Sequence, residues 1–306
     1  MNFFLISTIE QGFIFGLVAL GVFITYRILD FPDLSVDGTF PLGAAVSALC
    51  LSSGMNPFLS LIFAIIAGFI AGGITGLLHV KLKITNLLSG ILVMIALYSI
   101  NLRIMGKPNV QLFSLKKVFD YEFFKVEGLS SFFIIVLCII LFKVLLDLFL
   151  KTRLGFLLRA VGDNESLVTS LGVDKDIIKV FGLMLSNGIV AFAGALMAQY
   201  QGFADVTMGT GTVVTGLASV IIGSTFLKNI GGMKGTTIAI VGAMLYKIII
   251  SLALSVKWLQ PSDLKLITAV IVVMILSLNN TNFKLFNRKE KNVLKNRNSD
   301  GGDLVA

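Results

Sequence analysis

KTRLGFLLRAVGDNESLVTSLGVD fills residues 151–174, a polar, glycine-punctuated segment between two apolar stretches. The stretch before it is Ser130–Leu150 and the stretch after it is Ile177–Gln201. A helix needs about 20 apolar residues to cross a hydrocarbon layer of about 30 Å. Both neighbours are long enough to span a membrane, so we expect the segment between them to lie outside the lipid as a short helix.

The composition of the whole chain is that of a polytopic membrane protein. Of its 306 residues, 56% are hydrophobic and only 14% are charged. Further spans are expected at Phe3–Tyr26, Pro57–His79, Thr85–Met105, Thr236–Val256 and Leu264–Leu278. Two shorter runs, Thr39–Ser53 and Thr212–Leu227, are rich in small residues, which is typical of broken or re-entrant helices inside a bundle. The sequence predicts an all-α membrane domain over residues 1–280 with about eight to nine transmembrane segments.

The distribution of Lys and Arg predicts the orientation of the chain, because cytoplasmic loops retain positive charge. Basic residues gather in the loop after His79, in residues 151–176, in residues 228–235 and in the tail 281–306. The intervening loops 106–129 and 257–263 contain acidic residues. We therefore expect an external N-terminus, a cytoplasmic C-terminus and a disordered, basic cytoplasmic tail.

Several classes of function are disfavoured by the sequence. The net charge of +8 lies in membrane-flanking loops and the tail, where anionic lipid accounts for it without nucleic acid. His79 stands alone and the two cysteines lack CxxC spacing, so no metal site is expected. No GxxxxGK[ST], no HExxH and no nucleophile with a general base is recognisable, so no catalytic site is expected. The chain is then expected to form a pathway for a solute across the membrane. It would be a channel, a gradient-driven carrier, or one subunit of a pump in which another chain supplies the energy.

The segment 151–174 contains the signals of a short helix. Asp163 or Asn164 can cap its N-terminus, and Glu165 suits the positive end of its dipole. Gly172 supplies a left-handed C-terminal stop. The predicted helix has about eight residues and a length of about 12 Å.

The predicted helix has a small apolar side made of Leu167, Val168 and Leu171. It has no basic face, so its attraction to anionic headgroups is expected to be weak. A short amphipathic helix of this kind suits a groove on a soluble partner. We favour protein docking over attachment to the lipid surface.

The same segment carries a family resemblance. The string RAVGDNE at residues 159–165, followed by SLGV at 170–173, resembles the coupling loop of bacterial ABC-importer permeases of the branched-chain amino acid and ribose class. The small-residue helix 181–200 and the segment 31–47 extend the likeness over about residues 5–280. The form FPDLSVDG at 31–38 is most similar to a subgroup of amino-acid permeases, some of them associated with aromatic amino acids.

The resemblance implies how such a chain is powered. The loop would insert into a cleft of a cytoplasmic ATPase subunit, which binds ATP and Mg²⁺, while this chain binds no cofactor. The implied coupling residues are Arg159, Gly162, Asp163, Asn164, Glu165, Leu167, Leu171 and Gly172. Further implied partners are an extracytoplasmic solute-binding protein and a second permease copy, in a homodimer or heterodimer, within the bacterial cell membrane.

The resemblance favours an amino acid as the imported solute, and an aromatic one is possible within the subgroup. Sugars and nucleosides stay open, because related permeases carry them. A secondary carrier or channel that works alone is the alternative to the importer.

An internal repeat indicates where the solute passes. Gly38-Thr39-x-x-x-Gly43-x-Ala45 recurs as Gly211-Thr212-x-x-x-Gly216-x-Ala218, each time at the start of a short apolar segment. In the expected topology the two segments run in opposite directions. Paired short helices of an inverted repeat are typical of a transport site near the middle of the membrane. The plainer alternative is that small residues let helices pack closely.

Candidate pathway residues follow from this repeat. They are Asp33 and Asp37 just before the first short helix, Thr39 and Thr212 at the starts of the two helices, Gln199, Gln201 and Asp205 near the external end of the preceding span, and Lys247 inside 236–256. Lys247 is a candidate partner for a substrate carboxylate, since an unpaired charge within a span is costly. The alternatives are turn formation for the first two aspartates, wetted helix ends for the external group and internal pairing for Lys247.

Overall fold

Six helices of the described residues are long and apolar enough to cross a membrane. The computed structural model describes residues 2–121, 130–227 and 233–254, together with residues 266, 269, 270, 273 and 274. The six are α1 (Asn2–Val22, continued by a π-helical segment Phe23–Ile28), α3 (Pro57–Leu82), α4 (Asn86–Met105), α5 (Ser130–Phe149), α8 (Lys175–Gln201) and α10 (Gly235–Leu254). Two shorter apolar helices are α2 (Val36–Ser52) and α9 (Thr212–Leu227). The all-α membrane bundle is confirmed.

The expected ninth span, Leu264–Leu278, lies mostly outside the described residues, and the expected tail 281–306 lies wholly outside them. Contacts divide the chain into a unit of residues 1–252 and a unit of residues 253–306. The helices of the bundle form the first unit.

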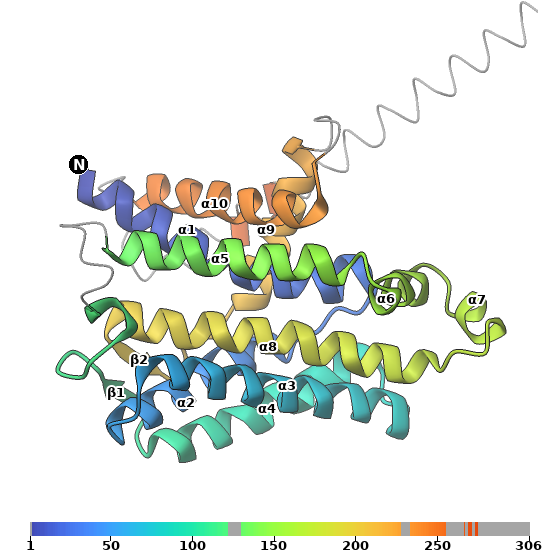
Figure 1. Cartoon of the computed structure of the whole chain (residues 1–306), viewed down its shortest axis with the longest axis horizontal. Coiled ribbons are helices and arrows are strands. Elements are labelled where there is room, and N and C mark those ends of the chain that lie inside the picture. The colour runs from blue at the N-terminus through green and yellow to red at the C-terminus, as the bar shows by residue number, and fades with distance from the viewer. Residues whose placement is uncertain are drawn as a thin grey trace, which may run out of the picture. The chain divides into compact units, whose positions relative to one another are not determined.

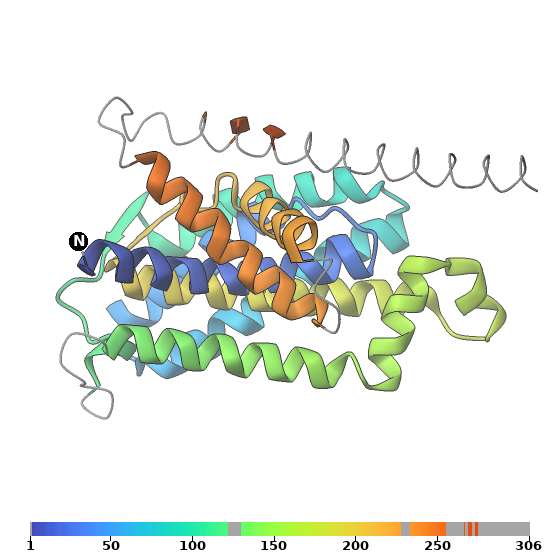
Figure 2. The ribbon, with the colours of Figure 1, turned by 90° about the horizontal axis from the view of Figure 1, so that it is seen from above.

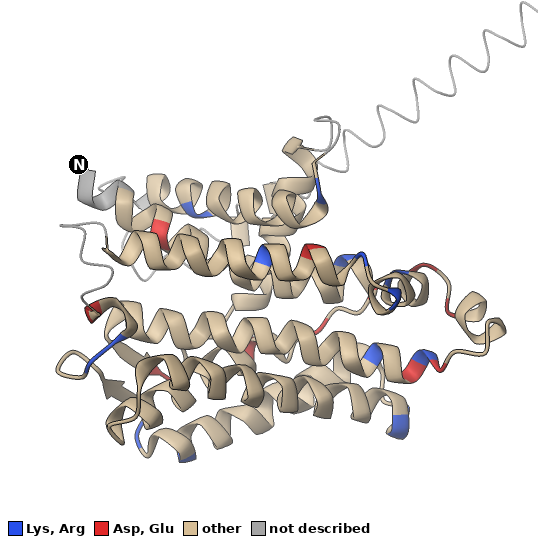
Figure 3. Cartoon of the chain, in the orientation of Figure 1, with Lys and Arg blue, Asp and Glu red and all other residues tan. Residues whose placement is uncertain are grey.

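The helices of this unit run between two ends (Figures 1 and 2). At one end lie the start of α1 and a ribbon of β1 (Asn109–Gln111) and β2 (Phe203–Asp205), which pair antiparallel. At the other end lie α6 (Arg153–Asp163) and α7 (Glu165–Ser170). Most of the positions with Lys, Arg, Asp or Glu lie toward the two ends, and fewer lie between (Figure 3). This distribution is expected of helices whose middles lie in lipid.

Helix α8 lies at the centre, and small residues bring its neighbours against its backbone. A Cβ atom on Gly43 of α2 would lie 1.8 Å from the Ala191 carbonyl oxygen of α8. A Cβ on Gly72 of α3 would lie 2.2 Å from the Leu183 oxygen of α8. No side chain fits at such distances, so only glycine permits these contacts. Packing of this kind replaces the hydrophobic effect, which does not drive helices together in lipid.

The two short helices begin beside each other. The carboxylate of Asp37, in the first turn of α2, accepts hydrogen bonds from the backbone N–H groups of Gly211 (3.0 Å) and Val213 (2.7 Å) at the start of α9. From there α2 runs to the β1–β2 end, where Ala48 and Leu51 share an apolar cluster with both strands. This packing sets the direction of α2, the first of the two short helices, within the bundle.

Helix α9 runs the other way, toward α6 and α7. Its Gly223 packs on Ile238 near the start of α10. That start is held to the last turns of α5, because Thr236 Oγ1 donates to Asp147 Oδ1 at 2.6 Å. Because α5 leads directly into α6, the C-terminal end of α9 lies at the α6–α7 end of the bundle. The two short helices therefore diverge from a common starting point, as an inverted repeat requires.

Candidate functional site

The polar segment forms two helices where one was expected. Asn164 has an extended backbone (φ −160°, ψ 101°) that ends α6 and begins α7. Its Oδ1 accepts from the N–H groups of Ser166 (3.0 Å) and Leu167 (3.2 Å). Asn164 is therefore the cap, whereas Asp163 is the last residue of α6. Helix α7 has six residues, fewer than predicted, and Gly172 follows it with φ +74°.

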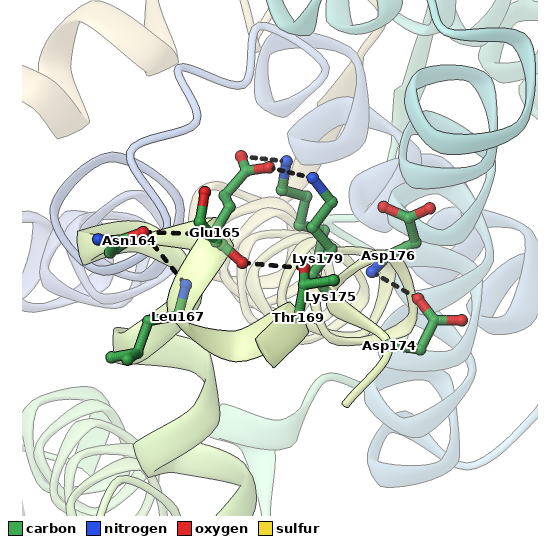
Figure 4. A network of polar contacts seen from close by, with 9 residues as sticks. Asn164, Glu165, Leu167, Thr169, Asp174, Lys175, Asp176 and Lys179 are labelled. Carbon is green, nitrogen blue, oxygen red and sulfur yellow. Dashed lines mark hydrogen bonds and ion pairs between the residues drawn. The ribbon is translucent and has the colours of Figure 1, made fainter. Parts of the chain in front are cut away.

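Helix α7 is fastened to α8 by charge. Glu165 accepts hydrogen bonds from Lys175 Nζ (2.8 Å) and Lys179 Nζ (2.5 Å), both in the first turns of α8 (Figure 4). The hydrogen bond from Lys175, followed by that from Lys179, holds the pKa of Glu165 below its usual value. Glu165 thus faces its own chain and links the two helices.

The other predicted coupling residues divide into an outward and an inward set. Leu167 and Leu171 are 54% and 62% exposed, and Arg159, Asp163, Asn164 and Gly172 are exposed as well. Val168 is fully buried, so it does not share the outward side with Leu167, contrary to the sequence interpretation. The outward set is available to a partner.

Gly162 belongs to the inward set. A Cβ there would lie 1.8 Å from the carbonyl oxygen of Ile28, at the end of the first span. Its role in this structure is the close packing of α6. Sequence reasoning also missed Leu154 and Phe156 of α6, which are 48% and 66% exposed beside the outward set. The sequence did contain a signal for them, namely two large apolar residues close to basic residues in a segment that was expected to lie outside the lipid.

In the middle of the bundle, two predicted pathway residues meet a residue that the sequence analysis missed. Asn187 of α8 donates through Nδ2 to Asp33 Oδ2 (2.8 Å), and its Oδ1 accepts from Thr39 Oγ1 (2.7 Å) and Ser35 Oγ (3.2 Å). The four residues, here called the central cluster, are buried. The missed signal was an asparagine within an apolar span, where polar side chains are costly unless they are partnered.

Asp37 lies inside the first turn of α2, although it was expected just before the helix. The reason is that α2 begins three residues earlier than predicted. Thr212 opens α9 and is almost fully buried. Next to this junction is a cavity of about 440 Å³. It is lined by α2, by α4 and by the loop that precedes α9.

The external group of predicted residues does not join the central cluster. Gln199 is buried, and its amide is fully engaged: Nε2 donates to Ser47 and Ser60, and Oε1 accepts from the Val118 N–H. Gln201 ends α8, and Asp205 is in β2, where it accepts from the Asn109 side chain. These contacts hold the β1–β2 end together.

Lys247 packs against an aromatic ring. Its Nζ lies 3.6 Å from the centre of the Phe15 ring on α1, and Phe15 stacks on Phe40 of α2. Within the described part of the chain, no carboxylate pairs with Lys247. A cation over a ring is stabilised by the ring quadrupole.

The sequence pattern of the branched-chain amino acid transport system permease component family matches residues 4–279. The chain belongs to this family. The permease is similar to a tyrosine transport system permease protein of Clostridioides difficile (strain R20291), at 48% identity over 95% of this chain and 96% of the relative. It also resembles a ribose import permease of Haemophilus influenzae, at 25% identity over 79% and 74% of the two chains.

A nucleoside ABC transporter permease of Lactococcus lactis is 24% identical over 80% of this permease and 82% of the relative. No solved structure matches the permease at a significant level. The family consists of permease components of transport systems, so this chain is a membrane subunit and not an enzyme. Within the described residues, no group of three or more His, Cys, Asp or Glu is placed to hold a metal ion.

Proposed function

We propose that this permease is the membrane-spanning subunit of an ATP-driven importer for an aromatic amino acid. In this proposal α6 and α7 dock on a cytoplasmic ATPase, which binds ATP and Mg²⁺. A solute-binding protein delivers the solute at the β1–β2 end. The N-terminus is then external, and two permease copies, identical or different, enclose the pathway.

The observation that carries the proposal is that one helix, α8, joins the docking element to the middle of the bundle. Lys175 and Lys179 at its start hold Glu165 of α7. About two turns beyond Lys179, Asn187 holds Asp33 and Thr39. A displacement of α7 by an ATPase would therefore move α8 and, with it, the starts of the short helices. The backbones of α2 and α8 are in contact at Gly43, so a displacement of α8 would press directly on α2.

The substrate class rests on similarity. The relative at 48% identity is named as a tyrosine transport permease, and it spans nearly the whole chain. The ribose and nucleoside relatives are much less similar. Tyrosine or a close aromatic analogue is therefore the first solute to test, with sugars and nucleosides as comparisons.

The test is reconstitution of the permease with the ATPase and the solute-binding protein of the proposed importer. We expect radiolabelled tyrosine to enter proteoliposomes only when ATP is available to the ATPase and the binding protein is present. Ribose and uridine serve as matched negative solutes. Entry of tyrosine through the permease alone, driven by a sodium or proton gradient, would instead establish the stand-alone carrier.

A further inference from the structure

An unusual buried atom belongs to a residue that lines the cavity beside the two helix starts. Asn101 of α4 is fully buried and lines the cavity. Its Nδ2 donates to the Gly38 carbonyl oxygen at 3.0 Å, which fixes the orientation of the amide because a carbonyl only accepts. Its Oδ1 has no partner, and it is the one buried side-chain polar atom in that state within the described residues. Buried polar atoms are nearly always partnered, so this oxygen indicates a missing hydrogen-bond donor.

The lining of the cavity restricts what that donor is. The lining residues with polar side chains besides Asn101 are Asp37, a carboxylate, and the hydroxyl residues Tyr98, Ser99, Thr207 and Thr210. No Lys, Arg or His is part of the lining. Both Asp37 oxygens accept a backbone N–H, and each keeps a further lone pair. A group rich in donors and positive in charge, such as an ammonium, fits this set of acceptors best.

The remaining lining suits an apolar body. Pro41, Met94, Ile95 and Val206 contribute hydrocarbon surface, and Tyr98 contributes a ring. A volume of about 440 Å³ lies within the range of small-ligand pockets. The cavity therefore has room for one amino acid with a large apolar side chain.

We propose that this cavity holds the transported amino acid, with its ammonium group between Asn101 Oδ1 and the Asp37 carboxylate and its side chain along α4. The inference rests on the proposed function, because it names a binding site for the same solute. It assigns Asn101 as a specificity residue that recognises the amino group. It also places the site where the two short helices begin, so that their separation would open or close the cavity.

The test measures whether a compound occupies the cavity, and it does not require the binding protein. Ser99, which lines the cavity and is exposed, is replaced by cysteine in a background in which Cys50 and Cys138 are replaced by alanine. The permease–ATPase complex in lipid nanodiscs is then labelled with a small maleimide. The probes are tyrosine, tyramine, which lacks the carboxylate, and 3-(4-hydroxyphenyl)propionate, which lacks the amino group.

We expect tyrosine and tyramine to slow labelling and the compound without the amino group to have no effect. Asn101→Leu should raise the half-protecting concentration of tyrosine by about tenfold or more, as expected for a lost charge-assisted hydrogen bond. Ser89→Ala is the control, since Ser89 is buried on the same helix and does not line the cavity. Co-purification of each variant with the ATPase as a monodisperse complex reports whether it is folded.

Equal protection by all three compounds, or protection by none, overturns the inference. So does unchanged protection in Asn101→Leu. The comparison of the three compounds needs no Asn101 variant, so a folding defect does not obscure it. ATP-driven uptake by the unaltered complex tests the proposed function separately, because uptake can succeed while the cavity proves empty.

Discussion

Helix α8 makes two polar attachments, and they differ in burial. At its start, Lys175 and Lys179 hold Glu165, whose side chain is 44% exposed. In its middle, Asn187 holds Asp33 and Thr39, and all three are buried. Exposed ion pairs contribute about 0–1 kcal/mol, whereas a buried polar group that loses its partner costs about 1–3 kcal/mol or more. The central attachment therefore maintains the fold, and the partly exposed one orients α7 with a smaller contribution to stability.

The largest effect is expected from Asn187→Leu. This change removes the Asn187 amide that donates to the buried Asp33 carboxylate, and it leaves Thr39 with only the Ser35 carbonyl oxygen as acceptor. We expect a loss of about 3 kcal/mol or more in the free energy of unfolding. The measurement is thermal unfolding in mild detergent. Ser186→Ala, one residue earlier, removes a single hydrogen bond to the Gly21 oxygen and should cost much less; equal losses would contradict a special role for the cluster.

A second change tests the packing around the same centre. A Cβ on Gly72 would lie 2.2 Å from the Leu183 oxygen, whereas a Cβ on the adjacent Gly73 would lie 3.4 Å from the Met184 side chain. Gly72→Ala should therefore destabilise by about 2 kcal/mol, and Gly73→Ala by much less. The unfolding midpoints of the two variants, measured under the same conditions, test this difference. Similar midpoints would show that α3 can move away from α8 at little cost.

The exposed attachment should respond differently. Glu165→Gln removes the charge that meets Lys175 and Lys179 while it keeps the size of the side chain. We expect less than about 1 kcal/mol of change in the free energy of unfolding. Hydrogen exchange in α7 should nevertheless become faster. Asp176→Asn is the control, because this neighbouring carboxylate makes no ion pair with either lysine. Faster exchange in both variants would assign the effect to general charge.

The smallest effect concerns pH. The pKa of Glu165 is held below 4.5 by its two lysines. A lowered pKa means that the attachment is fully present above about pH 4.5 and is lost as the pH falls through the lowered value. Exchange of the α7 amides, corrected for its intrinsic pH dependence, should rise only as the pH falls through the lowered pKa of Glu165. A rise near pH 6 would point to another group.

The spans and the short helices were predictable because each depends on the sequence of a single continuous segment. Length and hydropathy predict a span, and the repeated Gly-Thr motif marks the starts of α2 and α9. The Gly172 stop was equally local, since it follows from residue type alone. The family resemblance at residues 159–173 was also sufficient to predict the permease class that the comparisons support.

What the sequence could not supply was which side chains meet. Asn187 lies more than 150 positions from Asp33, so the central cluster had no local signature. Gly162 suited a docking loop in sequence, but its surroundings make it a packing residue. Asn101 carries no motif at all, and its importance depends on one unpartnered oxygen in a cavity formed by three separate segments.

The most direct test is a charge swap at the α7–α8 attachment, measured as tyrosine imported per ATP hydrolysed by the reconstituted transporter. Glu165→Lys should hydrolyse ATP with little import, because it repels Lys175 and Lys179. Adding Lys175→Glu and Lys179→Glu should restore most of the import while the hydrolysis rate stays similar. Import at the unaltered ratio in Glu165→Lys, or no recovery in the folded triple variant, would contradict transmission of movement from α7 through α8.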